Sequence, residues 1–92
     1  MNKTELIEHI SKQADISKAA AGRALDAVMG GVEQALVRSE SVNLSGFGTF
    51  SVAQRQEREG RHPRTGEPIR IAGGRVPKFR PGQALREALN TH

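Results

Sequence analysis

The stretch from residue 53 to 68 reads AQRQEREGRHPRTGEP, and it constrains the fold more than any other part of the chain. Its only aliphatic side chain is Ala53, so it offers almost nothing that could enter a core, and arginine recurs at every third position from 55 to 64. Such a segment projects into solvent or stays disordered. An ordered projection is favoured because residues 62–66, HPRTG, have good turn chemistry and an Ile-Arg-Ile alternation follows. The stretch therefore predicts a long two-stranded β-arm at about 53–75.

A β-hairpin is predicted immediately before this arm. Apolar and polar residues alternate over 42–44 and again over 50–52. The two alternations are separated by Gly46-Phe47-Gly48, which is a suitable turn.

After the arm the chain is expected to return to the body of the protein. Gly73-Gly74 would form a flexible root for the arm, and residues 76–79 would be the returning strand. A short terminal helix is predicted from Ala84 to Leu89, begun by Pro81 because proline suits the first helical position.

The N-terminal residues predict a helical hairpin. Asn2 can cap a first helix that runs to about Ala14, and Ser17 can cap a longer second helix. Apolar residues of the second helix follow an i, i+4, i+7, i+8, i+11, i+15 pattern, at Ala21, Leu25, Val28, Met29, Val32 and Leu36. Gly30-Gly31 should cost about 1 kcal/mol each relative to Ala inside that helix. We expect the close approach of another backbone to compensate, a simple kink being the alternative.

Charge is distributed unevenly along the 92 residues, whose net charge is +4. Residues 1–45 hold five basic against six acidic residues, whereas residues 46–92 hold nine basic against four acidic residues, and eight of the nine are Arg. Arginine presents a planar fork that suits phosphates and narrow grooves. The second half of the chain is therefore expected to bind a polyanion, with a merely solvated basic surface as the alternative.

The composition also limits how the chain can be stabilised. There is no Trp, Tyr or Cys, and the three aromatic residues are Phe47, Phe50 and Phe79. Because a short chain buries a small share of its surface, an obligate partner subunit is the expected remedy. No stretch approaches the about 20 apolar residues of a membrane span, and charges interrupt the N-terminus too often for a signal peptide. We therefore expect no membrane partner and a chain that starts at Met1.

No motif for catalysis or for a cofactor is found. Histidines at positions 9, 62 and 92 lie too far apart for local metal-ligand spacing, so neither a metal nor a cofactor is expected. Gly46-Phe47-Gly48 begins like a dinucleotide fingerprint, but Ser51 replaces the final Gly and a strand follows where a helix is needed. Gly60 and Gly66 bracket a loop without the Gly-Lys-Ser/Thr of a P-loop. The chain is therefore not expected to be an enzyme.

Motifs along essentially the whole chain resemble the HU and integration host factor family of bacterial histone-like proteins. Residues 1–7, MNKTELI, and 16–26, ISKAAAGRALD, are similar to its helical hairpin, and residues 46–50, GFGTF, to its signature turn. The arm residues Arg55, Arg58, Gly60, Arg61, Pro63, Thr65 and Gly66 are similar to the family's arm motif, which reaches into the minor groove. Pro63 matches the intercalating tip, in a family that inserts apolar wedges between base steps.

The resemblance implies an α+β fold in an intertwined dimer. It would contain an N-terminal helical hairpin, a three-stranded antiparallel sheet with a long protruding β-arm, and a short C-terminal helix. Residues 1–92 would be one domain: a helical dimerisation part at 1–45, a β-saddle at 46–80 and a C-terminal helix at 81–92. The implied function is binding and bending of double-stranded DNA without sequence specificity, in the bacterial cytoplasm at the nucleoid.

From the resemblance and the charges we expect two sets of functional residues. The residues expected to bind DNA are Lys3, Arg55, Arg58, Arg61, His62, Pro63, Arg64, Arg70, Arg75, Arg80 and Arg86. The expected dimer core contains Leu36, Leu44, Phe47, Phe50 and Phe79. His62 replaces the Asn that the family usually has before the tip proline, and DNA phosphates near an imidazolium predict binding that tightens as the pH falls.

Several alternatives stay open. Phe79-Arg80-Pro81-Gly82-Gln83 is similar to integration host factor, which keeps a sequence-specific heterodimer subunit as the second reading. Lys3 could pair with Asp26 instead of binding DNA. A homodimer is expected, and a heterodimer with a paralogue is the alternative. RNA binding beside DNA binding stays open. The competing functional class is a protein-interaction domain whose basic arm binds an acidic protein.

Overall fold

A computed structural model describes residues 1–91. His92, which the sequence assigned to the terminal segment, lies outside the described residues. The chain divides into two compact units, Met1–Gln34 and Ala35–His92.

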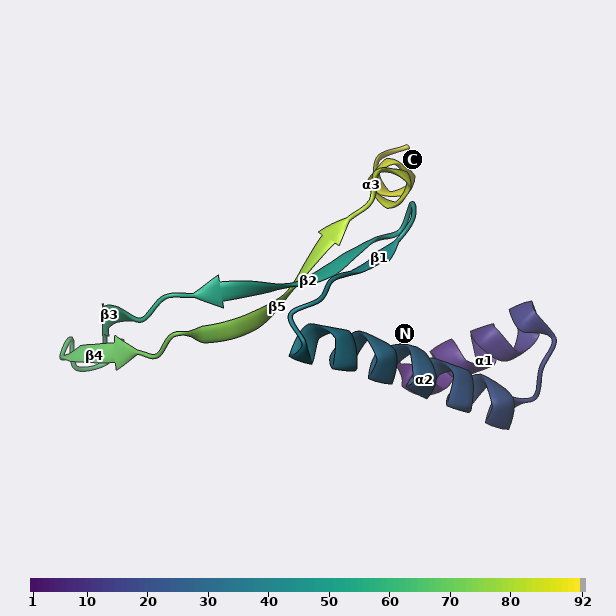
Figure 1. Ribbon diagram of the computed structural model, residues 1–92, viewed down its shortest axis with the longest axis horizontal. Helices are drawn as coiled ribbons and strands as arrows, with labels where there is room; N and C mark the ends of the chain where they lie inside the picture. Colours follow the sequence, from purple (N-terminus) through teal and green to yellow (C-terminus); the bar gives the residue numbers. More distant parts are fainter. Residues whose placement is uncertain (92) are drawn as a thin grey trace. The chain divides into compact units, whose positions relative to one another are not determined.

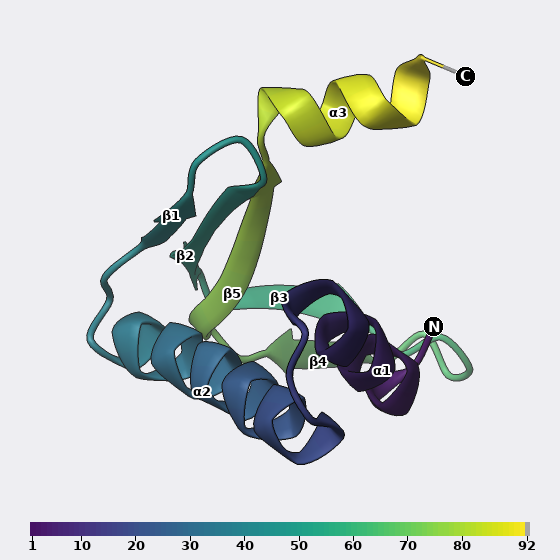
Figure 2. The ribbon, with the colours of Figure 1, turned by 90° about the vertical axis from the view of Figure 1, so that its right-hand side faces the viewer.

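The N-terminal residues form the predicted helical hairpin, with α1 at Lys3–Ala14 and α2 at Lys18–Val37 (Figure 2). Both predicted caps are confirmed. Asn2 Oδ1 accepts a hydrogen bond from an amide in the first turn of α1 at 2.9 Å. Ser17 Oγ accepts one from an amide in the first turn of α2 at 3.1 Å. Each cap satisfies a backbone donor that the helix leaves without a partner.

The second unit contains the predicted three-stranded antiparallel sheet, in the order β1-β2-β5. Its strands are β1 (Val42–Leu44), β2 (Gly48–Arg55) and β5 (Gly74–Pro81). Gly48 is buried where the hairpin turn enters β2. A Cβ atom at Gly48 would lie 2.5 Å from the ring of Phe79, so a residue without a side chain is required for that ring to pack there.

The predicted arm is present as a ribbon that continues β2 and β5 (Figure 1). Its distal part is a separate two-stranded sheet made of β3 (Arg58–Arg61) and β4 (Pro68–Ile71). Pairing between β2 and β5 ends at Arg55 and Gly74, and β3–β4 pairing then begins at Arg58 and Ile71. The arm is thus two ribbon segments with an interruption between them.

Gly73 explains why the two strands come so close at this interruption. A Cβ atom there would lie 2.7 Å from the carbonyl oxygen of Arg55 and 2.8 Å from the amide nitrogen of Glu57. Gly73, which the sequence assigned to a flexible root, therefore permits the close approach of two backbone segments. We call residues 56–57 and 72–73 the arm joint.

The terminal helix α3 extends over Gln83–Asn90, with Gly82 as its N-cap. The prediction that Pro81 begins this helix is wrong, because Pro81 is the last residue of β5 and pairs with Gly48. Proline fixes φ near −65°, which also fits extended backbone, and the final position of a strand tolerates it.

Very little of the chain is buried. Among the residues whose burial the structure describes, Ala21 and Ala35 are the only buried ones with a hydrophobic side chain. The accessible surface is 7586 Å². A single chain therefore lacks the core that a stable domain of this size needs.

Candidate nucleic-acid interface

One face of the three-stranded sheet is polar and basic. Directly opposite residues share a face, and successive residues alternate between faces. The register pairs Thr49 with Arg80 and Ser51 with Lys78, so both cations lie on the same face. Arg55 lies on that face as well, because it follows Ser51 by four residues in β2. We call Arg55, Lys78 and Arg80 the saddle cations; all three are exposed.

Lys78 is a member of this set that the sequence analysis missed. It is the one lysine in the basic second half of the chain. The signal was present as a period of two along β5, where Val76, Lys78 and Arg80 share a face. Strand alternation, applied to the returning strand, would have included it.

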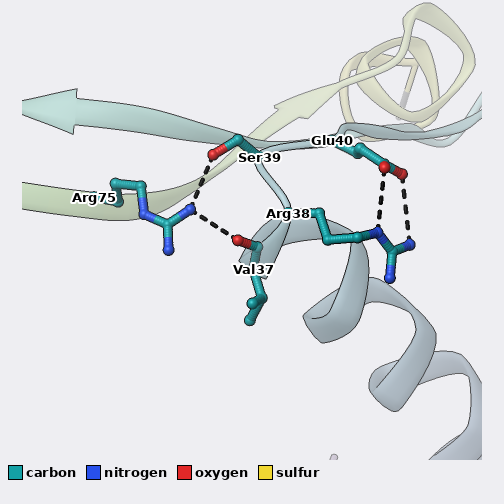
Figure 3. A network of polar contacts seen from close by, with 5 residues as sticks. All are labelled: Val37, Arg38, Ser39, Glu40 and Arg75. Carbon is teal, nitrogen blue, oxygen red and sulfur yellow. Dashed lines mark hydrogen bonds and ion pairs between the residues drawn. The ribbon is translucent and has the colours of Figure 1, made fainter.

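Arg75 lies on the opposite face and contacts the end of α2 (Figure 3). Its Nη1 donates hydrogen bonds to the carbonyl oxygen of Val37 and to Ser39 Oγ, both at 2.9 Å. A cation at a helix C-terminus is favourable because the last carbonyl groups there lack partners. Beside it, Arg38 pairs with Glu40 at 3.2 Å. Arg75, which the sequence placed among the DNA contacts, thus has a structural role as the C-terminal cap of α2.

The four other arginines of the arm differ in their partners. Arg70 in β4 forms an ion pair with Glu57. Arg61 Nη1 donates to the carbonyl oxygen of Gly66 at 3.0 Å, across the tip turn. Arg58 and Arg64 are exposed and take part in none of the ion pairs found within residues 1–91. The arm therefore presents cations that a polyanion can reach.

The tip of the arm is an ordered turn around Pro63. The amide of His62 donates to the carbonyl oxygen of Glu67 at 2.8 Å, and the amide of Gly66 donates back to the carbonyl oxygen of His62 at 2.9 Å. Gly66 has a positive φ of 71°, which glycine adopts without strain. Pro63 is exposed at the end of this turn.

Comparison with known proteins places the chain in a family. The family model described as "Bacterial DNA-binding protein" matches residues 1–90. This chain belongs to that family. Its relatives include DNA-binding protein HU-beta of Neisseria meningitidis, 58% identical over 97% of this chain and 100% of the relative. HU-beta of Salmonella typhimurium is 56% identical over 98% of this chain and 100% of the relative. An Anabaena HU–DNA cocrystal structure superposes with a TM-score of 0.91 at 37% identity, covering 97% of each chain.

The family is named for DNA binding, and this member carries two further residues expected to contact DNA outside the sheet and arm. Arg86 is exposed on α3. Lys3 forms an ion pair with Asp26 at 2.9 Å, which is the pairing that the sequence offered as the alternative to a DNA contact. Their side chains are 57% and 62% exposed. An exposed pair is worth little, so DNA phosphates can compete for Lys3 at low cost.

The opposite sheet face of this family member is apolar. Val42, Phe50 and Phe79 lie in one row across the three strands. Phe79 packs against Phe50 and Phe47, with ring centroids 4.9 Å and 5.7 Å apart. Nevertheless, Phe79 is 41%, Phe47 51% and Leu44 40% exposed. Leu36 and Phe50, the other expected core residues, are half-buried.

The part of this family member that the structure describes has neither a metal-binding cluster nor a membrane-spanning helix. No three His, Asp or Glu residues among 1–91 lie close enough together to hold a metal ion. No helix within the same residues has the length and apolar character needed to cross a bilayer.

Proposed function

We propose that this HU-family chain binds double-stranded DNA with little regard for its sequence and bends it. The observation that carries the proposal is the gathering of the saddle cations on one polar sheet face, from which an arginine-rich arm continues. Such cations neutralise phosphates, a contact that carries no sequence information. The HU–DNA cocrystal supports this reading, since its fold superposes on the chain with a TM-score of 0.91.

The arms would act in the minor groove. Arg55, Arg58, Arg61 and Arg64 would line the groove, and Pro63 would enter a base step and stabilise a kink. A rigid apolar ring suits that role, because unstacking costs a few kcal/mol per step and the bend brings more phosphates against the protein. Those further phosphates would contact Lys78, Arg80 and Arg86. Lys3 and Arg70 would join them where the phosphates displace their present ion-pair partners.

The functional unit would be a dimer, with a homodimer as the expected form. The exposed apolar sheet face needs a covering surface, and its occupant would be a second copy of this chain. Val28 and Met29 on α2 are also exposed. Beside them, a Cβ atom built on Gly30 or Gly31 meets no atom within 4 Å beyond the helix's own turns. The backbone expected near these glycines would therefore come from the partner.

Location and further partners follow from the same proposal. The relatives described above are named DNA-binding proteins, not enzymes, and a protein of this kind would act at the bacterial nucleoid. Binding to RNA would use the same cations, and a competition assay would measure it.

Fluorescence anisotropy with two labelled duplexes of unrelated sequence tests the proposal. Both duplexes should bind with similar affinity. About six to ten phosphate contacts should weaken binding by about 10³ to 10⁵ between 50 and 200 mM salt. Replacing Arg58 by Ala should reduce the salt dependence, whereas Arg38→Ala, which removes a cation already paired with Glu40, is the matched control. A shallow salt dependence combined with one strongly preferred duplex would overturn the proposal and favour the sequence-specific alternative.

A further inference from the structure

His62 accepts hydrogen bonds from two backbone amides of the tip turn. Its Nδ1 atom lies 3.1 Å from the amide nitrogen of Arg64 and 3.4 Å from that of Thr65. Its own amide and carbonyl group bond to Glu67 and Gly66. Backbone and side chain of this one residue thus hold both sides of the turn that presents Pro63.

This arrangement requires one particular form of the imidazole. A ring nitrogen accepts a hydrogen bond only while it carries no proton, so Nδ1 must be bare and the ring hydrogen must lie on Nε2. The imidazolium carries hydrogen on both nitrogens, and its Nδ1–H would then face two N–H donors. Protonation therefore removes an acceptor from the turn and places donors against donors.

We propose that His62 is a positioning residue for Pro63: its neutral imidazole caps the tip turn, and protonation removes this cap while the backbone hydrogen bonds of the turn remain. Asn and Asp side chains cap turns in the same way through an oxygen that bonds to a backbone amide two residues on. The proposal rests on the proposed function, since Pro63 matters only if the tip enters DNA. It adds a pH-dependent control of the bend to that function.

The charged groups around His62 belong to the tip itself. Arg61 precedes it and bonds to the carbonyl oxygen of Gly66, Arg64 follows it in the turn, and Glu67 begins the return. In a DNA complex, phosphates would join them, and an imidazolium would add one positive charge to their attraction. Loss of the cap acts on the shape of the tip instead. As the pH falls, affinity and bend angle should therefore change in opposite directions.

NMR of the free protein tests the cap without DNA. An imidazole titrates within about pH 5 to 8. Between pH 8 and 5 the amide proton signals of Arg64 and Thr65 should move with the same midpoint as the His62 ring. In His62→Asn, which keeps an acceptor that does not titrate, they should stay in place. At pH 8 the ring nitrogen spectrum should show hydrogen on Nε2. Hydrogen on Nδ1, or amide signals that ignore the ring titration, would overturn the proposal.

Energy transfer between dyes at the two ends of a DNA duplex tests the consequence at fixed salt. The parent protein should bend DNA less at pH 5.5 than at pH 8 and approach the bend of His62→Ala. His62→Asn should give the same bend at both values. Equal pH dependence in the parent and in His62→Asn would refute the positioning role. If no variant bends DNA at either pH, the proposed function fails, while the NMR result still decides whether the cap exists.

Discussion

At the scale of single residues, Pro63 should separate bending from affinity. Replacing Pro63 by Ala removes the rigid ring at the exposed tip and leaves every arginine in place. The bend should fall more than the affinity, because phosphate contacts supply most of the attraction. Energy transfer between labelled DNA ends measures the bend, and anisotropy measures the affinity. An unchanged bend would make Pro63 an ordinary turn proline.

Lys78 offers a second test at this scale. Its place between Val76 and Arg80 on the polar face predicts a phosphate contact. Lys78→Ala should weaken binding to all duplexes alike and lower the slope of log affinity against log salt by about 1. Lys12→Ala, which removes one exposed charge from α1, is the control and should leave the slope nearer its original value. Equal effects of the two variants would show that only net charge matters.

Individual residue roles were predicted unevenly from the sequence. The charge of the arm and the exposed Pro63 are local properties, and the sequence indicated both. The contact of Arg75 with Val37 and Ser39 depends on which face of β5 the side chain occupies and on what lies 36 and 38 residues away. Such a contact needs the strand register and the end of α2 together, and neither can be obtained from a local pattern.

At the scale of elements, the contact between Arg75 and α2 should be measurable as stability. Arg75→Ala removes a cation from the end of α2, together with its hydrogen bonds to the carbonyl oxygen of Val37 and to Ser39 Oγ. The loss should be about 1 kcal/mol, or about 4–8 °C in melting temperature. Arg58→Ala, an exposed arm residue outside the ion pairs found in the described chain, is the comparison. If both variants melt at the same temperature as the parent, the cap contributes nothing.

The ends of helices that are set by a capping side chain were predicted to within a residue or two. Asn2 and Ser17 fix the starts of α1 and α2, because a capping side chain bonds to amides within its own turn. The start of α3 was misplaced, since Pro81 suits a strand end as well as a helix start. The arm joint was expected only as a flexible root, because the close approach of two backbone segments at Gly73 is a long-range contact.

At the scale of the whole molecule, assembly and folding should be inseparable. With only Ala21 and Ala35 buried among the apolar residues described, one chain has too little core to fold alone. Dilution should therefore cause dissociation of the dimer and loss of helical structure together. Sedimentation would measure the dissociation, and circular dichroism on the same samples would measure the helical structure. A monomer that keeps its helical signal and its melting transition would contradict the shared core.

The arm joint also has a mechanical consequence. A paired ribbon resists deformation through its ladder of hydrogen bonds, and at residues 56–57 and 72–73 the pairing is interrupted. We therefore expect the arm to deform more easily at this joint than along its paired segments. If the arms hold DNA as proposed, resistance of the duplex to bending would deform the arm joint before the paired segments. The complex would then contain DNA with a range of bend angles instead of one fixed angle. The spread of bend angles within one population would then report the stiffness of four backbone residues.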